Sequence, residues 1–568
     1  MLEKLNKQLN FLCINNPIST ICVSLFLTIL ISSGVTYVTQ DDNMINLLPE
    51  DIGSRQTFSE IQDDYGLTEY MYVAVGNKNK NIFNKNDLKV ISDLSNQFEA
   101  LDIVDEVISI TNLDKISLDP ADSSIVIDDI IQFPILNQEQ IDDVVKYLND
   151  NRIIKSRVVS QKDDYANIII IPENSDYYVE LTENIHSITK KYDNAYELHY
   201  GGQAYVTGAV PGMVQKEVKI LLLFGLLLMS IILLINLRNI KAVGLILFII
   251  STSLASMFGF MGWVYHLTGY NSFYFTMMNT SMPIVLLTIA NSDGVHVLSR
   301  FFRELRKLKD TKRAITSTMK NLFLPIFLTS ITTSAAFMML IFSPVGSMIG
   351  YGFTIAFGIM WAWLLSNTLL PSLIVLLKWD IKSKAISKPS YIENLMRAFG
   401  GIVTKNPKRV LSMGIIGTLF AVIGIFFITV EVQYTKMFKK GNIIRDSAVF
   451  LDDHLMGNVN VLLRVSSDLG PESLKNPKNL KDIEKIQTYL DTMRNVTSTI
   501  SINDVVKQLH KTIMDEDDNY YTIPDSIQQI NNLLFLYEMN EESDISSLIN
   551  YDADQGIITA LMKTFSTI

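Results

Sequence analysis

The sequence predicts a polytopic α-helical membrane protein that carries α+β domains outside the membrane. Charged residues make up 19% of the 568 residues, yet several windows contain almost none. Each window is about as long as the ~20 residues that an α-helix needs to cross a bilayer. Two long windows between them are rich in Asp and Glu, and short motifs recur about 390 residues apart. The fold class is therefore a duplicated unit, and we expect its second copy to be truncated.

Seven stretches are long and apolar enough to span a bilayer. Backbone amides inside lipid must be paired within their own segment, so these stretches are helices. The first is longer than the apolar part of a signal peptide, and the sixth is long enough to tilt or to extend past the membrane. The seven predicted spans are 18–38, 220–237, 242–264, 273–297, 322–342, 348–377 and 410–430.

The distribution of Lys and Arg predicts the orientation, because short loops rich in these residues face the cytoplasm. With seven spans, all the basic loops fall on one side of the membrane. The N-terminus is then cytoplasmic, and segments 39–219 and 431–568 lie outside, which is the periplasm if this is a bacterial inner-membrane protein. The basic residues are Lys4, Lys7, Arg238, Lys241, Arg300, Arg303, Arg306, Lys307, Lys309, Lys312, Arg313, Lys320, Lys378, Lys382, Lys384, Lys388, Arg397, Lys405, Lys408 and Arg409.

The predicted domains follow from these spans. Segment 39–219 alternates β-rich runs, such as Tyr70–Val75 and Ile168–Ile171, with helical patterns, such as Asp87–Leu101. That alternation predicts split β-α-β units packed as a sheet with helices. The expected order is a cytosolic amphipathic helix (1–17), a span (18–38), an outer domain (39–219), five spans (220–377), a cytosolic linker with a helix (378–409), a span (410–430) and a partial outer domain (431–568).

Composition excludes several function classes. The net charge of −11 does not suit a nucleic-acid binder. The two cysteines, Cys13 and Cys22, lie in or beside the first span, so neither a disulfide framework nor a Cys/His metal cluster is expected. No phosphate-binding loop is present, so ATP hydrolysis is not supported. We expect no cofactor, and we do not expect an enzyme.

An internal repeat is indicated by matches at a nearly constant interval. Leu2-Glu3-Lys4-Leu5 matches Ile392-Glu393-Asn394-Leu395, and Asn16-Pro17 matches Asn406-Pro407, both 390 residues apart. Gly66 corresponds to Gly457, and Ile108-Ser109-Ile110 to Ile500-Ser501-Ile502. The unit is one short helix, one span, an outer domain and five spans.

A second full copy would run well beyond residue 568. The stretch Ile558–Phe565 resembles a strand, and we expect its partners to be absent. The chain is therefore interpreted as truncated and lacking five further spans. A natural half-size chain is the alternative, which is disfavoured because it would leave strand edges exposed.

One carboxylate, Asp293, lies well inside an apolar span. A charged side chain at the centre of a membrane helix costs ~2.5–3.5 kcal/mol on insertion scales, so Asp293 should face the bundle interior. A carboxyl group that binds and releases a proton there is what proton coupling needs. The alternatives for Asp293 are a structural ion pair and a snorkelling side chain, because Arg300 follows only seven residues later.

Several neighbouring polar residues are candidates to support Asp293. His296 follows at i+3 and is expected to share its face, where it would relay the proton or tune the carboxylate, or simply form hydrogen bonds near the cytosolic end. Thr329, Thr332 and Thr333 on the fifth span, with Asn291 on the fourth, offer further hydrogen-bonding groups. Hydroxyls on a membrane helix also serve ordinary helix packing.

Taken together, these segments resemble the resistance-nodulation-division superfamily, in particular the MMPL-type and hopanoid-type lipid exporters. The resemblance covers the whole chain and is carried by the order of spans and outer domains and by four runs. They are Asn43-Met44-Ile45-Asn46-Leu47-Leu48-Pro49, Ser292-Asp293-Gly294-Val295-His296-Val297-Leu298-Ser299-Arg300-Phe301, Pro325-Ile326-Phe327-Leu328-Thr329-Ser330-Ile331-Thr332-Thr333-Ser334-Ala335 and Leu370-Pro371-Ser372-Leu373.

The resemblance implies proton-driven export of lipid-like or hydrophobic substrates, ferredoxin-like porter domains, a sterol-sensing-like set of spans and Asp293 as proton carrier. Gly294 and Ile289 depart from residues common in the family near the Asp. Expected partners are membrane lipid or a hydrophobic small molecule and protons, with no nucleic acid; a homodimer or homotrimer is left open. The competing functions are a lipid-binding sensor or scaffold and an accessory protein of protein translocation.

Overall fold

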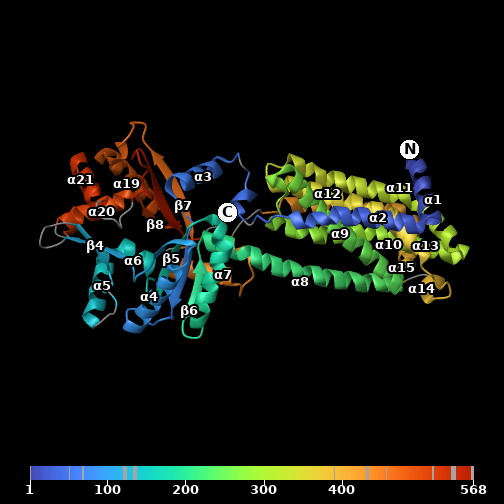
Figure 1. Cartoon of the computed structure of the whole chain (residues 1–568), viewed down its shortest axis with the longest axis horizontal. Helices are drawn as coiled ribbons and strands as arrows, with labels where there is room; N and C mark the ends of the chain where they lie inside the picture. The colour runs from blue at the N-terminus through green and yellow to red at the C-terminus, as the bar shows by residue number, and fades with distance from the viewer. Residues whose placement is uncertain are drawn as a thin grey trace. The chain divides into compact units, whose positions relative to one another are not determined.

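A computed structural model provides the structure of the chain. It describes residues 2–41, 43–49, 51–66, 69–118, 125–131, 133, 137–388, 391–429, 434–455, 457–514, 517–538 and 545–564. The chain forms two compact units, coloured along the chain in Figure 1. The helical unit contains Met1–Glu50 and Met213–Thr429, and the α/β unit contains Asp51–Gly212 and Val430–Ile568.

The described part of the chain contains seven helices long and apolar enough to cross a membrane, which confirms the polytopic helical prediction. They are α2 (Pro17–Ser32) with the 3-10 helix η1 (Ser33–Tyr37), α8 (Gln203–Leu237), α9 (Ile240–Thr268), α10 (Met282–Leu308) preceded by η6 (Met277–Ser281), α11 (Thr311–Met338) with η7 (Met339–Phe342), α12 (Gly346–Asn367) followed by α13 (Leu369–Leu376), and α16 (Pro407–Ile425). The shorter helices of this unit are α1 (Leu2–Asn15), η2 (Met44–Leu47), η5 (Asn271–Phe273), α14 (Lys384–Ser387) and α15 (Tyr391–Lys405).

Local sequence explains where these helices begin and end. The side chain of Asn239 accepts a hydrogen bond from the backbone N–H of Ala242 at the start of α9. Asp310 does the same for Arg313 at the start of α11. Gly269 ends α9 in the left-handed conformation, which costs glycine little. These caps satisfy backbone groups that the helix ends leave unpaired.

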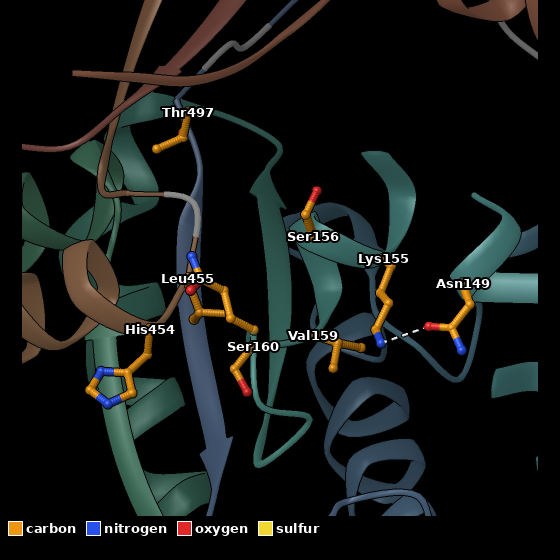
Figure 2. A pocket seen from close by; sticks show the side chains of 9 residues that line it. Asn149, Lys155, Ser156, Val159, Ser160, His454, Leu455 and Thr497 are labelled. Carbon is orange, nitrogen blue, oxygen red and sulfur yellow. Dashed lines mark hydrogen bonds between the residues drawn. The ribbon is translucent and has the colours of Figure 1, made fainter. Parts of the chain in front are cut away.

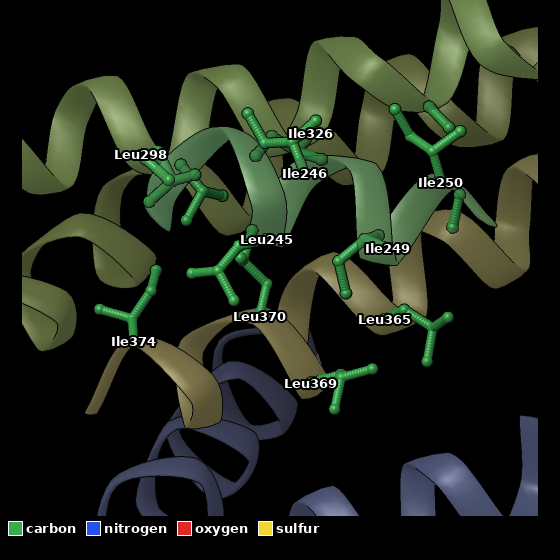
Figure 3. Close-up of a cluster of buried hydrophobic side chains, with 14 of the residues drawn as sticks. Leu245, Ile246, Ile249, Ile250, Leu298, Ile326, Leu365, Leu369, Leu370 and Ile374 are labelled. Atoms are coloured by element: carbon green, nitrogen blue, oxygen red, sulfur yellow. The ribbon is translucent and has the colours of Figure 1, made fainter. Parts of the chain in front are cut away.

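The core of the helical unit lies where α9, α10, α12 and α13 meet. Figure 3 shows aliphatic side chains from these helices, among them Ile246, Leu298 and Leu365, in one buried cluster. Close approach of backbones adds to this packing: a Cβ on Gly259 of α9 would lie 2.1 Å from the carbonyl oxygen of Ile31 on α2. Small residues allow such contacts, and helix association within a membrane relies on them.

The second span is longer than the apolar pattern predicts. Helix α8 begins at Gln203 and continues without a break to Leu237, although the apolar stretch starts only near residue 220. Lys216, Glu217 and Lys219 precede the apolar run, and as good helix formers they keep the helix continuous. The hydropathy pattern therefore located the apolar part of α8 but not its first turns.

The first lobe of the α/β unit is built on a four-stranded antiparallel sheet with the order β2-β5-β1-β6. Two helices, α4 and α7, connect β1 to β2 and β5 to β6, and a hairpin of β3 and β4 precedes α5 and α6. The elements are β1 (Met71–Gly76), α4 (Lys85–Glu99), β2 (Val104–Ile108), β3 (Asp114–Leu118), β4 (Ile125–Asp129), α5 (Gln138–Asp150), α6 (Arg152–Val158), β5 (Tyr165–Pro172), η3 (Ser175–Tyr177), α7 (Tyr178–Thr189), η4 (Lys190–Tyr192) and β6 (Glu197–Gly201).

The second lobe has a three-stranded antiparallel sheet with the order β7-β9-β8. Its elements are β7 (Val459–Ser466), η8 (Ser473–Lys475), α19 (Pro477–Asp491), β8 (Val496–Ile500), α20 (Ile502–Ile513), η9 (Asp518–Tyr520), α21 (Ile527–Glu538) and β9 (Gln555–Met562). Two further helices, α17 (Tyr434–Met437) and α18 (Ile443–His454), precede β7.

One expectation about the second lobe is wrong. The strand expected near Ile558–Phe565 was predicted to lack partners. Instead β9 is the central strand: Ile558 pairs with Leu463 of β7, and Thr559 pairs with Ile500 of β8. Phe565 itself lies outside the described residues. The alternation of apolar residues identified the strand, but pairing over almost a hundred residues of chain is decided by tertiary contacts.

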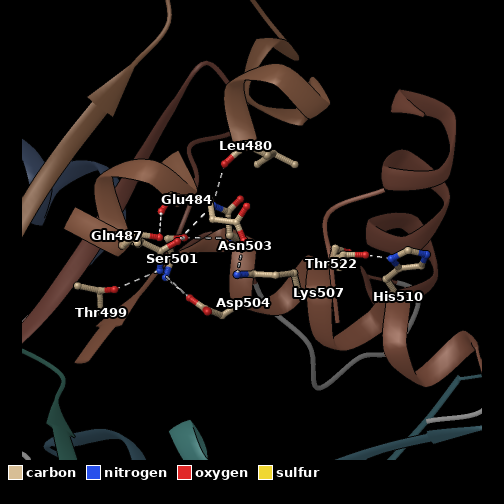
Figure 4. Close-up of polar contacts among 11 residues, drawn as sticks. Leu480, Glu484, Gln487, Thr499, Ser501, Asn503, Asp504, Lys507, His510 and Thr522 are labelled. Atoms are coloured by element: carbon tan, nitrogen blue, oxygen red, sulfur yellow. Dashed lines mark hydrogen bonds and ion pairs between the residues drawn. The ribbon is translucent and has the colours of Figure 1, made fainter. Parts of the chain in front are cut away.

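Equivalent elements of the two lobes lie at a constant interval. Helices α4 and α19 start 392 residues apart, as do strands β2 and β8, and α3 (Gly53–Tyr65) starts 390 residues before α18. A polar network recurs as well. Ser501 donates to Gln487 Oε1 at 2.9 Å, and its backbone N–H donates to Asp504 (Figure 4).

The corresponding residues of the first lobe are Ser95, Ser109 and Asn112, each 392 residues earlier. There the Ser95 hydroxyl donates to the Ser109 hydroxyl at 2.8 Å, and the backbone N–H of Ser109 donates to Asn112 Oδ1 at 2.7 Å. Both networks join the end of a strand to the helix that precedes it.

The two lobes exchange helices. Helix α3 precedes the first lobe in the chain, but its Ile61 and Tyr65 pack against Ile557 and Leu462 of the second lobe. Helix α18 precedes the second lobe, but its Leu451 and Leu455 pack against strands of the first lobe. Leu451 and Leu455 follow Ile61 and Tyr65 by 390 residues, so the same helix positions make the exchanged contact in both directions.

Candidate functional site

The candidate site in the helical unit is centred on Asp293 of α10. Its side chain is 7% exposed, and no other Asp, Glu, His, Lys or Arg side chain is buried among the described residues of the spanning helices. Ala290 and Val297, one turn on either side, are also buried. Gly294 faces α9, where a Cβ would lie 3.1 Å from Ile246. Asp293 therefore points into the bundle, as the cost of exposing a charge to lipid requires.

Ser330 on α11 is the hydrogen-bond partner of Asp293. Its hydroxyl donates to Asp293 Oδ2 at 3.3 Å, and both side chains are buried. Ser330 belongs to a buried stripe of α11 that also contains Phe323, Ile326 and Ser334. The Ser334 hydroxyl donates to the carbonyl oxygen of Ala356 on α12 at 3.1 Å. This stripe fixes the rotation of α11 about its axis and so directs Ser330 at the carboxylate.

The hydroxyl that contacts Asp293 lies on a different face of α11 from the three threonines that were expected to support it. Thr329, Thr332 and Thr333 donate to the carbonyl oxygens of Ile326, Leu328 and Thr329 on their own helix, at 2.7–2.8 Å. Thr329 and Thr332 are exposed. The signal that would have found Ser330 is the i, i+4 series of Ile326, Ser330 and Ser334, which alternates with the threonines.

His296 is not brought to Asp293. It is exposed, whereas Asp293 and Val297 are buried, and the described residues include no hydrogen bond between His296 and Asp293. Three residues turn a helix by about 300°, so a side chain at i+3 lies at the edge of the face rather than on it. Its role as a relay remains a prediction.

Asn291 and Arg300 lie on either side of Asp293 in the sequence of α10. Among the described residues, neither forms a hydrogen bond with Asp293. Asn291 Oδ1 and Arg300 Nε are both buried, and neither has a hydrogen-bond partner among the described residues. Within the same part of the chain, no ion pair joins Arg300 to Asp293, whose recorded partner is the uncharged Ser330. A structural ion pair is thus not the arrangement observed around this carboxylate.

The chemistry available at the site is that of one carboxyl group and one hydroxyl group. A hydroxyl can donate to a carboxylate and accept from a protonated carboxyl, so Ser330 can partner both forms of Asp293. The described residues contain no group of His, Cys, Asp and Glu side chains arranged to hold a metal ion. The arrangement is suited to binding and releasing a proton.

Comparisons with known proteins agree that the chain is a membrane protein. The model of the MMPL family matches residues 78–410, more than half of the chain, and this region includes Asp293 and Ser330. A membrane protein of Methanocaldococcus jannaschii is 21% identical over 392 residues, covering 66% of this chain and 95% of that protein. Seven apolar helices and the family match lead to one conclusion: the chain is a membrane protein of the MMPL family, within the resistance-nodulation-division superfamily.

Proposed function

We propose that the protein is a secondary transporter that moves lipid-like substrates out of the membrane and draws its energy from protons carried by Asp293. The observation that supports it is a buried carboxyl group whose recorded partner is a neutral hydroxyl, within a bundle of membrane helices. A buried carboxylate left without a cation is costly unless it takes up a proton or gains access to water. Proton-coupled transport requires Asp293 to alternate between a protonated, buried state and an ionised state that water can reach.

The energy available to this cycle follows from the charge that moves. One elementary charge crossing 100 mV supplies about 2.3 kcal/mol. When Asp293 is protonated, the site is neutral and suits the apolar bundle. When the proton leaves, Ser330 donates to the carboxylate, and the residual cost of the charge favours rearrangement of the helices around it. Movement of the substrate is then coupled to the side of the membrane from which Asp293 takes up its proton.

The rest of the architecture is proposed in the same terms. We infer a plasma or inner-membrane protein whose basic loops face the cytoplasm and whose α/β unit lies outside as porter domains of ferredoxin-like type. The sheet order of the first lobe supports this, because counting β1, β2, β5 and β6 as one to four gives the order 2-3-1-4 of a split β-α-β sheet. The interval of 390–392 residues between equivalent elements supports an internal duplication.

Transport by reconstituted protein tests the role of Asp293. We expect Asp293→Asn to insert and fold normally but to reduce proton-driven movement of an NBD-labelled phospholipid to the level of protein-free liposomes. Asn keeps the shape and hydrogen bonding of the side chain but cannot carry the proton. The measurement is dithionite quenching of the label after an imposed pH gradient.

Glu217→Gln is the matched control, because Glu217 is an exposed acid on the spanning helix α8. It should leave transport unchanged. Full transport by Asp293→Asn would refute the proposed coupling. Binding of the labelled lipid that ignores the gradient in the unmodified protein would instead favour a lipid sensor or scaffold.

A further inference from the structure

Helix α2 turns hydroxyl groups, and not its apolar side chains, towards the interior of the helical unit. Its buried residues are Ser24 and Thr28, which lie one turn apart on the same face. Apolar side chains of the same helix are exposed, among them Phe26 at 66% and Ile29 at 68%. The inward side of α2, called here the hydroxyl face, therefore carries groups that need hydrogen-bond partners in a region where lipid offers none.

A break between α12 and α13 lies beside the hydroxyl face. Helix α12 ends at Asn367 and α13 begins at Leu369, with Thr368 between them at φ −121° and ψ −66°. Pro371 explains the break, because it lacks the N–H that would donate to the carbonyl oxygen of Asn367, four residues earlier. The Ser24 hydroxyl donates to Thr368 Oγ1 at 3.4 Å, so the hydroxyl face and the break are in contact.

Oxygen atoms on both sides of this contact lack good partners. Thr28 Oγ1 and Asn367 Oδ1 have no hydrogen-bond partner among the described residues, and their side chains belong to residues that are 4% and 3% exposed. No backbone N–H of the described chain donates to the carbonyl oxygen of Asn367. That oxygen accepts from Cys13 Sγ of α1 at 3.6 Å, and a thiol is a weak donor. Buried polar groups in this condition favour a small ligand that can hydrogen-bond to them.

The cavity of about 500 Å³ in the α/β unit shows the contrast (Figure 2). Its lining residues are polar, but their groups are paired within the protein. The ammonium of Lys155 pairs with Asp163 Oδ1 at 2.8 Å, and the Ser160 hydroxyl donates to Asp164 Oδ1 at 2.8 Å. Unlike these groups, the oxygen atoms beside the break still require a partner.

We propose that water enters the helical unit along the hydroxyl face and hydrates the break between α12 and α13. Water donates and accepts hydrogen bonds, so it can satisfy both the Thr28 hydroxyl and the two oxygen atoms of Asn367. A cation is a poorer fit, because α2, α12 and α13 contain no acidic residue to balance its charge. Water here replaces the backbone hydrogen bond that Pro371 removes, which allows the chain to bend at the break without leaving a carbonyl group unpaired.

Reaction of introduced cysteines with silver ions tests whether water reaches the hydroxyl face. The full-length protein, with Cys13 and Cys22 changed to Ser, would carry Thr28→Cys or Ile29→Cys in lipid nanodiscs, where both membrane faces meet the solution. Silver reacts with the thiolate, which forms only where water reaches the thiol. We expect Thr28→Cys to react at least about tenfold faster than Ile29→Cys, because lipid around the second thiol suppresses its ionisation.

The fraction of blocked thiol is measured by alkylation with N-ethylmaleimide in SDS and mass spectrometry. A second pair, Ser24→Cys and Val23→Cys, gives the same comparison if Thr28→Cys does not fold, since Val23 is 58% exposed and a cysteine closely matches a serine in shape. Rates in sodium nitrate and choline nitrate should be equal. Slower reaction in sodium nitrate alone would show that a cation occupies the hydroxyl face and would overturn the assignment to water.

A further substitution locates the path of the water. In the Thr28→Cys protein, Ser24→Val should slow the reaction with silver about tenfold, because an apolar group replaces a hydroxyl that hydrogen-bonds to water. The matched control is Val23→Ile, on the exposed side of the same helix, which should leave the rate unchanged. Size-exclusion profiles and unfolding temperatures establish that each variant is folded.

The inference is overturned if cysteines on the hydroxyl face react no faster than their exposed neighbours, or if neither kind reacts. It is also overturned if Ser24→Val and Val23→Ile have the same effect. The inference does not depend on proton coupling: Asp293→Asn, which should fail to transport, should leave the reaction of Thr28→Cys with silver unchanged.

Discussion

At the scale of single residues, the candidate site consists of a buried carboxyl group and one hydroxyl group, because Ser330 on α11 donates to Asp293 Oδ2 at 3.3 Å. Asp293 was predicted because an acid inside an apolar span is rare and costly. Ser330 required knowledge of how α11 is rotated against α10, since hydroxyls occur on several faces of α11. The same rotation turns Thr329 and Thr332 away and leaves His296 exposed.

The Ser330 contact leads to a graded prediction. Ser330→Ala should keep the fold but lower proton-driven transport about tenfold, because the carboxylate loses its donor while the proton carrier remains. Thr329 is adjacent to Ser330 in the chain, and its hydroxyl donates to the carbonyl oxygen of Ile326 on its own helix. Thr329→Ala should therefore transport normally. Initial rates of lipid transport in liposomes measure both. Equal rates for the two variants would show that the hydrogen bond has no role.

A second residue-level prediction concerns stability against pH. His199 of β6 stacks on Phe450 of α18 with ring centroids 3.6 Å apart, and His454 also stacks on Phe450, with ring centroids 4.3 Å apart. Burial lowers the pKa of His199 to about 4 from an ordinary value of 6.5. Above pH 6.5 the imidazole is neutral in both the folded and the unfolded chain. As the pH falls from 6.5 towards 4, only the unfolded chain gains the proton, so stability is lost over that window.

His199→Phe should remove this part of the pH dependence while keeping a ring in the stack. The difference in unfolding free energy between the unmodified protein and the variant should change by about 1–2 kcal/mol between pH 7 and pH 4, less than the full shift implies because the imidazole keeps some contact with water. Thermal unfolding across this range measures it. His510→Phe, at a half-buried position outside this stack, is the control, and parallel curves for both variants would contradict the assignment.

At the scale of elements, the exchange of α3 and α18 is the feature that makes the two lobes one unit. Each helix presents two apolar side chains at the same positions, Ile61 and Tyr65 or Leu451 and Leu455, to a sheet formed by the other part of the chain. An amphipathic helix is recognisable from its own sequence. The sheet that it covers is not, because both sheets offer similar apolar faces.

The exchange predicts crossed effects. Leu451→Ala should destabilise the first lobe, and Ile61→Ala the second, each by about 2–4 kcal/mol, because both side chains are buried. Hydrogen–deuterium exchange followed by mass spectrometry should show faster exchange in β1 for the first variant and in β7 and β9 for the second. Faster exchange confined to the lobe next in the chain would show that the helices are not exchanged.

At the scale of the whole molecule, hydropathy and charge together set how the chain meets the membrane. Seven long apolar helices divide the chain so that its basic loops share one side. From this arrangement we propose that α15 lies in the cytoplasm and the second lobe outside. Neither conclusion depends on how the helical unit and the α/β unit are placed relative to each other.

Cysteine labelling tests this orientation. In a background in which Cys13 and Cys22 are changed to Ser, we expect Lys485→Cys to react with a membrane-impermeant maleimide on intact spheroplasts. Lys405→Cys should react only after the membrane is lysed. Both lysines are exposed, on α19 and α15, so accessibility to the reagent is decided by the side of the membrane. Labelling in the opposite pattern would reverse the proposed topology.

The sequence by itself determined the membrane class, the seven spans, the strand-and-helix alternation of the outer segments and the position of the acid that is buried among the described spanning helices. These depend on local composition and periodicity, which each segment carries within itself. Only the tertiary structure decided that β9 is a central strand, that Ser330 faces Asp293, and that α3 and α18 cross between lobes. Those features arise from contacts between segments far apart in the chain, and no local pattern selects one partner among many of similar chemistry.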